Sequence, residues 1–309
     1  MQTRGAPTDI GNAVTVWFDG RQLSDASVAL HALTHALHYG SSVFEGIRVY
    51  PTARGPAIFR LRDHVRRLYD GAEAYGMRIA LSQEAMFAEI CATVAASGRD
   101  AAYVRPLAFY GGDTVRLAPE NICETRALIA VLPFQGLMPG QTHFTAALTS
   151  VMKSPSAALP SHVKAGGHYT NSIRALHDVQ RRGFDEAILR NDRGEVAEGS
   201  GENVFVVHDG VLITNDVSAD ILPGITRDSV LTIARAAGIA VVIRPLTVDD
   251  LRAAQEVFFT GTAAEVAPVI RFEEREIAIG PVTNRLAAAY AAIVRGTTDA
   301  PADWLAFAR

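Results

Sequence analysis

Short apolar segments joined by tight turns are the feature that most limits how this chain can fold. The segment "AVTVWF" (13–18) ends in a turn at Asp19-Gly20, and "VFVVHDGVLIT" reverses direction around Asp209-Gly210. Turns this short join antiparallel strands, because a connection between parallel strands needs about a dozen residues or more. Segments with helical spacing alternate with these strands. We therefore predict an α+β architecture of two layered domains rather than a doubly wound parallel sheet.

Hydrophobic periodicity and turn residues indicate the individual elements. In the first half we predict a hairpin from "SVFEGIRVY" and "AIFRL", helices at 60–75 and 82–97 with a Ser82 cap, and strands at 102–110 and 126–134. In the second half we predict strands near 144–151, 186–190, 203–208, 211–214, 240–244 and 256–260, and helices near 170–182, 225–238, 247–253 and 281–295.

The stretch "QGLMPGQT" contains the Gly and Pro residues of a linker between domains. With 309 residues, of which 49% are hydrophobic, the chain is long enough for two domains with substantial cores. We predict a small N-terminal α/β domain at 1–133, a linker at 134–143, and a larger C-terminal domain at 144–309 that has sheets and flanking helices.

Charge and composition exclude several classes of partner. A net charge of −4 gives no concentrated basic surface for nucleic acid or for an anionic membrane. No apolar stretch approaches the roughly 20 residues of a membrane span, and the first residues lack the apolar core of a signal peptide. Cys91 and Cys123 form no CxxC pair, so we expect two inert buried thiols. We predict a cytoplasmic protein whose ligands are small molecules.

Two patterns suggest chemistry that we do not favour. His31, His35 and His38 have the spacing of one helical face, but a metal site would need a further ligand near them. We interpret them as packing or hydrogen-bonding residues and predict no metal. The segment "EGSGENVF" matches neither GxGxxG nor a Walker sequence, and we interpret the residues before it as a short polar hairpin. Nucleotide binding there is not expected.

Lysine is rare: only Lys153 and Lys164 occur among the 29 Lys and Arg residues. Lys164 lies in "HVKAGGHYTNS", where no carboxylate lies within five residues on either side. Most lysines are solvated surface charges, but a partly desolvated pocket favours the neutral amine, which is a nucleophile for carbonyl groups. Pyridoxal phosphate is the commonest cofactor bound through such a lysine.

That cofactor requires an acid beside its ring nitrogen, backbone amides and a cation for its phosphate, and apolar contact for its ring. Glu198 in "VAEGSGEN" has small neutral neighbours and is a candidate for the acid. The segment "ILPGITRDS" runs a Pro-Gly turn into a predicted helix start, which presents amides to an anion. The remaining candidates are Leu222 for the ring, Ile225 and Thr226 for the amides, Thr262 for a hydroxyl and Arg60 for the cation.

Seven ordered segments resemble the branched-chain amino acid aminotransferases, within the fold type IV (aminotransferase class IV) pyridoxal-phosphate enzymes. They are "HALHYGSSVFEGIRVY", "FRLRDHVRRL", "YVRPL", "VKAGGHY", "VAEGSGENVF", "LPGITRDS" and "FTGTAAEVAPV", and they cover nearly the whole chain. The resemblance implies the two-domain fold of D-amino acid aminotransferase-like enzymes and a homodimer.

The resemblance also implies a role for each motif residue. Lys164 would form the internal aldimine with pyridoxal 5′-phosphate and move a proton between the substrate α-carbon and the cofactor. Glu198 would pair with the pyridinium nitrogen and Tyr169 with the ring hydroxyl. The phosphate would be held by Arg60, the amides of Ile225 and Thr226, and Thr262, with Leu222 against the ring. The substrate would meet Tyr39, Phe44 and Tyr169, and its α-carboxylate would meet Tyr103 and the backbone around Thr262 and Ala263.

The substrate side is where the resemblance is both informative and imperfect. It assigns Arg105 to the distal carboxylate of glutamate or 2-oxoglutarate, which implies ping-pong transamination between that acid and an L-amino acid, with Leu, Ile and Val as expected donors. The family has a small glycine between two aliphatic residues in a loop that reaches the neighbouring subunit, and here Arg116 stands between Val115 and Leu117. A family tyrosine is also replaced near Leu137.

Arg116 leaves alternative functions open. An arginine at a pocket mouth would select a polar or anionic side chain, whereas an arginine that points into solvent would select nothing. The alternatives are a transaminase of specialised metabolism, a D-amino acid or amine transaminase, an aminodeoxychorismate lyase-like enzyme and a non-catalytic binding protein, because one fold hosts several functions.

Overall fold

The computed structural model describes residues 14–23, 27–119, 123–134 and 142–308, which form two compact units. Met1–Phe134 and Ala302–Arg309 belong to the first unit, and Gln135–Pro301 to the second. The expected second domain ran to residue 309, whereas strand β17 (Leu305–Phe307) pairs with β5 (Gly55–Phe59) of the first unit. Most of the expected linker at 134–143, Leu137 included, lies outside the described residues.

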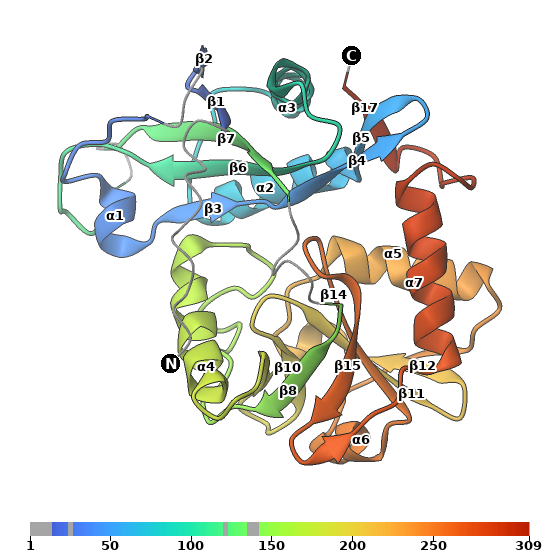
Figure 1. The fold of residues 1–309 in the computed structure, drawn as a ribbon. Coiled ribbons are helices and arrows are strands. Elements are labelled where there is room, and N and C mark those ends of the chain that lie inside the picture. The colour runs from blue at the N-terminus through green and yellow to red at the C-terminus, as the bar shows by residue number, and fades with distance from the viewer. Residues whose placement is uncertain (1–13, 24–26, 120–122, 135–141, 309) are drawn as a thin grey trace. The chain divides into compact units, whose positions relative to one another are not determined.

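An antiparallel sheet forms the body of the first unit (Figure 1). Its strands follow the order β17-β5-β4-β6-β7-β1-β2, and β3 also pairs with β6. The two-residue turn predicted after β1 is confirmed, because Asp19 and Gly20 have φ angles of 43° and 87°. The remaining bounds are β1 Thr15–Phe18, β2 Arg21–Leu23, β3 Ser42–Phe44, β4 Ile47–Thr52, β6 Ala102–Tyr110 and β7 Thr125–Pro133.

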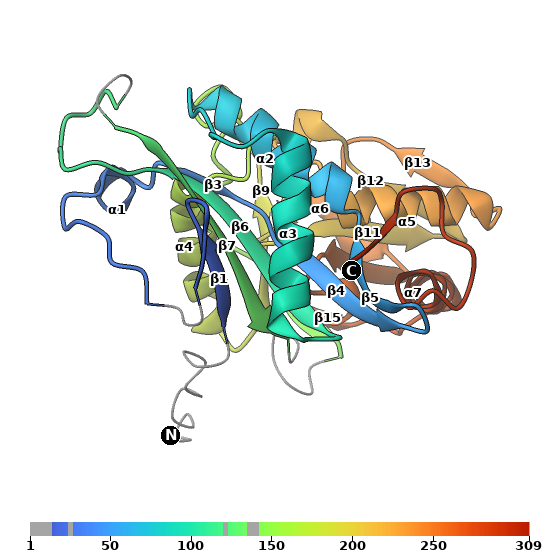
Figure 2. The same cartoon turned by 90° about the horizontal axis from the view of Figure 1, so that it is seen from above.

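Two predicted helices cover one face of this sheet. They are α2 (Leu61–Ala74) and α3 (Gln83–Ser97), and the Ser82 hydroxyl caps α3 by accepting a hydrogen bond from the Ala85 amide at 3.2 Å. Helix α3 packs against β1, β6 and β7 and crosses them in Figure 2. The core between the layers includes Ile47, Val49, Val104, Ile129 and Val131. Because side chains alternate along a strand, the other face of the sheet carries the intervening residues.

The residue between β3 and β4 is a buried acid. Glu45 has no exposed surface, and its carboxylate accepts hydrogen bonds from Arg67 Nε and Nη2 at 2.6 and 2.8 Å. Its Oε2 also lies 2.7 Å from His64 Nδ1. Burial alone would raise the pKa of Glu45, but the attraction of Arg67 and His64 outweighs it and holds this pKa well below 4.5. Glu45 therefore joins α2 to the sheet as an ionised group.

We expect Glu45→Gln to lower the free energy of unfolding of the first unit by about 3 kcal/mol, because it leaves the Arg67 charge without its carboxylate. Trp17 and Trp304 are the two tryptophans of the chain and both belong to the first unit, so their fluorescence during urea unfolding measures this change. The exposed Glu73 on α2 provides the control, and Glu73→Gln should change the value by less than about 0.5 kcal/mol.

The pH dependence of this difference follows from the pKa of Glu45, which folding lowers from 4.5. The stabilisation is therefore complete above the unfolded value and is lost as the pH falls below it. The difference between wild type and Glu45→Gln should shrink as the pH is lowered from about 5 to 3. A difference that is constant over this range would contradict the ion pair.

A mixed sheet forms the body of the second unit, in the order β10-β9-β8-β15-β14-β11-β12-β13, with β16 paired to β15. The β8–β9, β8–β15 and β12–β13 pairs are parallel and the others antiparallel. The α+β prediction is confirmed, although the sheet is not purely antiparallel. The bounds are β8 Phe144–Leu148, β9 Glu186–Arg190, β10 Val196–Gly199, β11 Asn203–His208, β12 Val211–Thr214, β13 Val241–Ile243, β14 Glu256–Gly261, β15 Glu265–Phe272 and β16 Arg275–Glu276.

The four helices predicted in the second unit are confirmed to within two residues. They are α4 (Tyr169–Gln180), α5 (Ile225–Ala236), α6 (Val248–Ala253) and α7 (Pro281–Val294). Strands β10 and β15 had not been predicted. Strand β10 pairs antiparallel with β9 across the polar turn at 191–195, so the short polar hairpin predicted before "EGSGENVF" is confirmed, and all four residues of β10 are buried. Strand β10 stands at one end of the sheet order, beside β9, and carries Glu198.

Candidate functional site

Lys164 and Tyr169 meet at the start of α4. A 3₁₀ turn at Gly166–His168 leads the chain from Lys164 into this helix. The turn brings the two side chains together, and Lys164 Nζ donates a hydrogen bond to the Tyr169 hydroxyl at 2.6 Å. Both side chains are half-buried and line one cavity of about 40 Å³. The amine predicted as a nucleophile is therefore held inside a pocket of the second unit.

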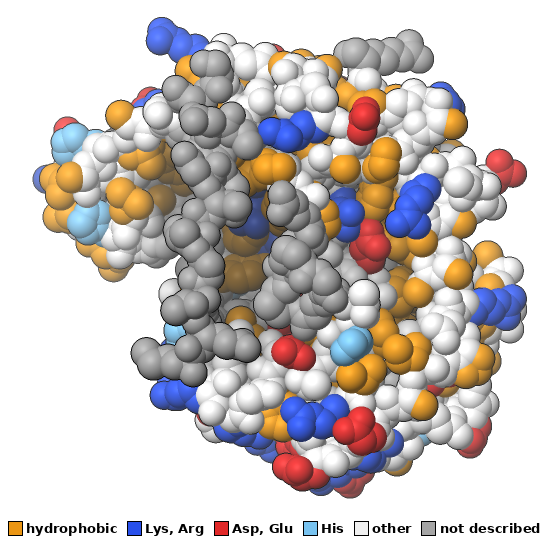
Figure 3. Space-filling model, in the orientation of Figure 1, with side chains coloured by type: hydrophobic (Ala, Val, Ile, Leu, Met, Phe, Trp, Pro, Cys, Tyr) orange, Lys and Arg blue, Asp and Glu red, His pale blue; other side chains and the backbone are white. Residues whose placement is uncertain are grey.

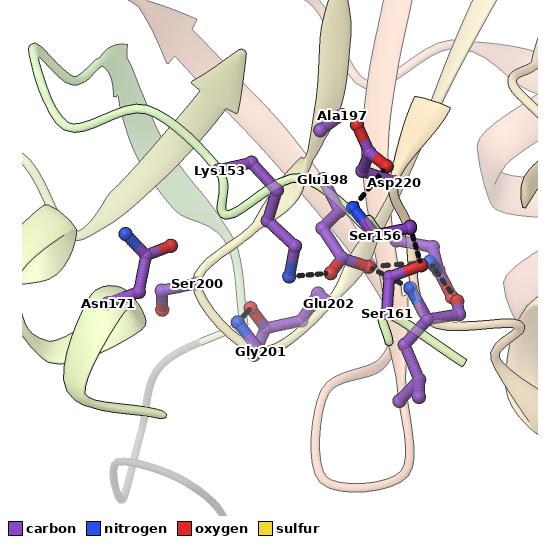
Figure 4. A network of polar contacts seen from close by, with 12 residues as sticks. Lys153, Ser156, Ser161, Asn171, Ala197, Glu198, Ser200, Gly201, Glu202 and Asp220 are labelled. Carbon is purple, nitrogen blue, oxygen red and sulfur yellow. Dashed lines mark hydrogen bonds and ion pairs between the residues drawn. The ribbon is translucent and has the colours of Figure 1, made fainter. Parts of the chain in front are cut away.

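The other lysine of the chain lines the same cavity. Lys153 Nζ donates to Glu198 Oε1 at 2.6 Å, and Figure 4 shows the two side chains pointing toward each other. The Lys153 amine is thus engaged by a carboxylate, whereas the Lys164 amine contacts a phenol. This difference makes Lys164 the better candidate for attack on a carbonyl group.

Glu198 is fixed by donors from three other segments. Its Oε2 accepts hydrogen bonds from Asn203 Nδ2 at 3.1 Å and from the Leu222 amide at 3.0 Å, while its Oε1 accepts from Lys153. The residue is only 6% exposed. A carboxylate has about four acceptor positions, so these three donors leave one position for a further donor.

Helix α5 begins beside this carboxylate. Gly224 is its N-cap and has no side chain to cap the first amides, which belong to Ile225 and Thr226. A Cβ atom on Gly224 would lie 2.0 Å from Asn203 Oδ1, so this position requires glycine. Free amides at the positive end of a helix attract an anion such as a phosphate. Thr262 and Ala263 follow the end of β14.

The cavity joins predicted and unpredicted residues. Its lining is Lys153, Ser161, Val163, Lys164, His168, Tyr169, Ser172, Glu198, Ser200, Gly201 and Leu222. Sequence reasoning missed Lys153, His168 and the three serines. The rarity of lysine was a signal for Lys153 as much as for Lys164. A different and wider hollow of about 680 Å³ in the first unit is lined by Glu73, Gly76, Met77, Arg78, Tyr110, Cys123, Glu124 and Thr125.

Two further acids of the second unit, Glu186 and Glu202, have raised pKa values. Burial, together with the nearby Glu186 carboxyl, raises the pKa of Glu202 to about 8, and burial also raises the pKa of Glu186. Glu202 therefore favours the protonated form at neutral pH, and the pKa of Glu186 is shifted in the same direction. Burial and the nearby Lys153 lower the pKa of His168, so its imidazole is neutral at pH 7.

The first unit holds the expected substrate residues Phe44, Tyr103 and Arg105. Tyr103 and Arg105 lie two apart on β6 and share the half-buried face of the sheet. Arg105 Nη2 donates to the Tyr103 hydroxyl at 3.0 Å, and its guanidinium lies 4.5 Å from the centre of the Phe44 ring. A Cβ atom on Gly46 would lie 2.0 Å from the Tyr103 hydroxyl. Glycine in "FEGIR" therefore makes room for this tyrosine.

Tyr39 and Arg116 lie on two neighbouring segments of the first unit. The Tyr39 hydroxyl donates to the Val115 carbonyl at 2.7 Å, and His35 Nε2 lies 3.1 Å from the Arg116 carbonyl. The side chain of Arg116 is exposed. The helix α1 (His35–Tyr39) begins after His31, so the three histidines do not share one helix. Each makes a hydrogen bond to backbone or to a hydroxyl, as predicted.

Arg60 lies at the junction of β5 and α2 in the first unit. Its backbone is in the left-handed region with φ of 54°, an uncommon conformation for a residue with a side chain. Its amide donates to the Trp304 carbonyl at 2.7 Å, and its guanidinium lies 4.8 Å from the Trp304 ring centre and contacts Asp63. Arg60 and the substrate residues Tyr39, Phe44, Tyr103, Arg105 and Arg116 thus belong to the first unit. The other expected cofactor residues, and the substrate residues Tyr169, Thr262 and Ala263, belong to the second.

Other classes of site receive no support within the described residues. No group of three or more His, Cys, Asp or Glu residues there could hold a metal ion. No described helix has the length and apolar character needed to cross a membrane. Cys91 and Cys123 are free and only half-buried, not buried as expected. Burial nevertheless raises the pKa of both thiols, which lowers their reactivity.

Comparison with known proteins gives a family match over most of the chain. Residues 42–272 match the family Amino-transferase class IV. The Branched-chain-amino-acid aminotransferase of Pseudomonas aeruginosa is 38% identical over 300 residues, which cover 94% of this chain and 95% of that protein. The branched-chain aminotransferase of Thermoproteus uzoniensis with norvaline has a TM-score of 0.90 and 37% identity, covering 94% of this chain and 98% of that one. The Thermobaculum terrenum branched-chain amino acid aminotransferase in its PLP-form has a TM-score of 0.89 and 30% identity, covering 96% and 98%.

Proposed function

The chain belongs to the amino-transferase class IV family, and we propose that it is a pyridoxal-phosphate-dependent transaminase of branched-chain L-amino acids with 2-oxoglutarate as acceptor. The observation that carries this proposal is the meeting of Lys164, Tyr169 and Glu198 in one cavity of the second unit. Relatives at 34–38% identity over most of the chain are named Branched-chain-amino-acid aminotransferase.

The residues of the second unit fit pyridoxal 5′-phosphate. The Lys164 amine can bond to the aldehyde of the cofactor, and the Tyr169 hydroxyl can hydrogen-bond its ring oxygen. The remaining acceptor position of Glu198 can accept from its protonated ring nitrogen. The uncapped amides of Ile225 and Thr226, with the Thr262 hydroxyl, can donate hydrogen bonds to its phosphate. Leu222 can pack against the face of its ring. Arg60 is the proposed cation, supported by its strained backbone, since such conformations concentrate at functional sites.

When bound, the cofactor supplies an aldehyde and an electron-withdrawing ring that accepts the electrons of the substrate Cα–H bond. Lys164 would hold the aldehyde carbon through its Nζ, and the free Nζ would take the α-proton of the substrate and move it to the cofactor. Tyr169 orients this amine through its 2.6 Å hydrogen bond. Glu198 keeps a negative charge where the ring nitrogen is positive.

We propose that residues of the first unit recognise two substrates in turn. Tyr103 is the proposed contact of the α-carboxylate, and Tyr39 and Phe44 are proposed contacts of the side chain. In the second unit, the backbone around Thr262 and Ala263 is proposed for the α-carboxylate and Tyr169 for the side chain. Arg105 provides a guanidinium for the distal carboxylate of glutamate, and it can rest against Phe44 and Tyr103 when that carboxylate is absent.

A panel of amino donors tests the substrate class. In single-turnover reactions, leucine, isoleucine, valine and glutamate should each discharge the visible band of the bound cofactor. Arg105→Leu should lower the single-turnover rate with glutamate about tenfold or more, because a charged hydrogen bond is lost. The rate with leucine should stay within about threefold of wild type. Fast reaction with a basic, polar or D-amino acid and none with leucine would instead favour the specialised or D-amino acid alternatives. The exposed side chain of Arg116 fits the interpretation in which this arginine selects no substrate.

We further propose a homodimer in the cytoplasm. An exposed apolar cluster on α1 and the 113–118 segment supports association, and Figure 3 shows hydrophobic and histidine side chains gathered where α1 lies. Its members are Leu30, Leu33, Leu37, Tyr39, Val115 and Leu117, which are 39–77% exposed. Two free thiols fit a reducing compartment. Light scattering tests the dimer, and a mass near 33.1 kDa, that of one chain, would contradict it.

A further inference from the structure

Three acidic side chains of the second unit lie close enough to influence one another, but they have different surroundings. Glu186 accepts hydrogen bonds from the amides of Ala187 and Ser200, both at 2.8 Å. Glu202 accepts one from the Gly201 amide at 3.1 Å. Glu198, the group proposed to face the ring nitrogen, forms an ion pair with Lys153. Whether Glu198 can pair with a cation depends on how protons are distributed among these three acids.

The contact between Lys153 and Glu198 is shielded from solvent. The two side chains are 17% and 8% exposed, and their charged atoms are 2.6 Å apart (Figure 4). Lys153 comes from the segment after β8, 45 residues before Glu198, so the fold and not local sequence creates the pair. A buried carboxylate without a cation favours its protonated form, and a lysine at hydrogen-bond distance opposes this.

In the neighbouring acid Glu202, burial outweighs the opposing attraction of the nearby Lys164. Burial and the Glu186 carboxyl raise the pKa of Glu202 to about 8, and Glu198 contributes further to this rise. Glu202 can therefore take up a proton at neutral pH, which lessens the negative charge around Glu198, and burial shifts the pKa of Glu186 in the same direction. The second unit thus contains an acid that is easily protonated beside one acid that has its own cation.

We propose that Lys153 is a positioning residue that orients the Glu198 carboxylate through their ion pair, so that Glu198, rather than Glu186 or Glu202, faces the positive ring nitrogen of the cofactor. This inference rests on the proposed function. Lys153 acts on one oxygen of the carboxylate, while Asn203 and the Leu222 amide act on the other. The carboxylate cannot turn without breaking one of these contacts. The two lysines therefore have different roles: Lys164 forms the covalent bond to the cofactor, and Lys153 orients the Glu198 carboxylate.

The first experiment measures the contact without cofactor. Thermal unfolding of Lys153→Met, Glu198→Gln and the double variant forms a double-mutant cycle, followed by circular dichroism because the tryptophans report the other unit. We expect the two single variants to lower the midpoint, and the double variant to be more stable than the sum of the two losses predicts. Strictly additive losses would overturn the ion pair.

The second experiment measures cofactor affinity, which a purely structural lysine would not change. Titration of each variant with pyridoxal 5′-phosphate, followed by its visible band, should give a dissociation constant roughly tenfold or more above wild type for Lys153→Met. Lys153→Arg keeps the charge and should stay within about threefold. Arg252→Met is the matched control, since it removes the same charge from an exposed pair with Asp249.

The outcomes separate this inference from the proposed function. An equal or tighter dissociation constant in Lys153→Met than in wild type would overturn the role of Lys153 alone. Failure of Lys153→Arg to restore affinity while its thermal midpoint matches wild type would also overturn it. Absence of any visible band in wild type would overturn the proposed function, and this inference with it.

Discussion

Replacement of Lys164 by alanine is expected to slow transamination by on the order of 10⁴-fold and to remove the visible band of the bound cofactor. The variant loses the amine that donates to the Tyr169 hydroxyl, and with it both the covalent bond and the proton carrier. Steady-state rates with leucine and 2-oxoglutarate, and absorbance spectra with added cofactor, measure the two losses. A band that persists in this variant would contradict the assignment.

The composition of the chain allows a sharper version of this experiment. Borohydride reduction fixes the bond between the cofactor and its lysine, and peptide mass spectrometry then locates the label. Only Lys153 and Lys164 can carry it as side-chain amines. We expect the label on the peptide that contains Lys164 in the wild type and in Arg252→Met. Label on Lys153 would transfer the covalent role to the lysine that the structure pairs with Glu198.

The second large effect is expected from Glu198→Gln, which should lower kcat about 10²-fold. The neutral amide keeps the shape of the side chain and can still accept from Asn203 and the Leu222 amide. It removes the charge that stabilises a protonated ring nitrogen, and it leaves Lys153 without its carboxylate. Single-turnover rates with leucine isolate this effect from changes in binding.

Glu202→Gln is the matched control for this prediction. Glu202 is a neighbouring acid of the same chemistry, but burial and Glu186 raise its pKa to about 8, so it is protonated at pH 7. Its replacement by a neutral amide should change kcat less than about threefold. Equal losses in the two variants would show that the protein requires carboxyl groups here for folding, and would contradict a specific role for Glu198.

Local signals predicted most of the elements. The Asp19-Gly20 and Asp209-Gly210 turns were recognisable because both residues of each adopt positive φ, which few residue pairs favour. Helices α2 and α3 followed from apolar spacing and from the Ser82 cap. Strand β10 was missed because its sequence "VAEG" has no alternation and contains an acid. Its burial comes from its neighbours in the sheet, which the sequence alone does not reveal.

The candidate site was predictable where its parts are close in sequence. Lys164 and Tyr169 lie five residues apart, and the Pro-Gly turn immediately precedes the amides of α5. The pairing of Lys153 with Glu198 spans 45 residues, and nothing in either segment specifies it. Strands β17 and β5 are separated by even more of the sequence, and for this reason the second domain was expected to continue to residue 309.

The return of residues 302–309 makes the first unit a discontinuous one, with consequences for dissecting the protein. A fragment that stopped at Phe134 would lack Trp304, whose ring packs edge-on against Phe59 at 5.6 Å and whose carbonyl binds the Arg60 amide. It would also expose β5 as an open sheet edge, which invites aggregation. Tags or truncations at the C-terminus therefore affect the contacts between Trp304 and Arg60, which lies about 240 residues earlier in the chain. No single cut in the chain can separate the two units and leave the first one whole.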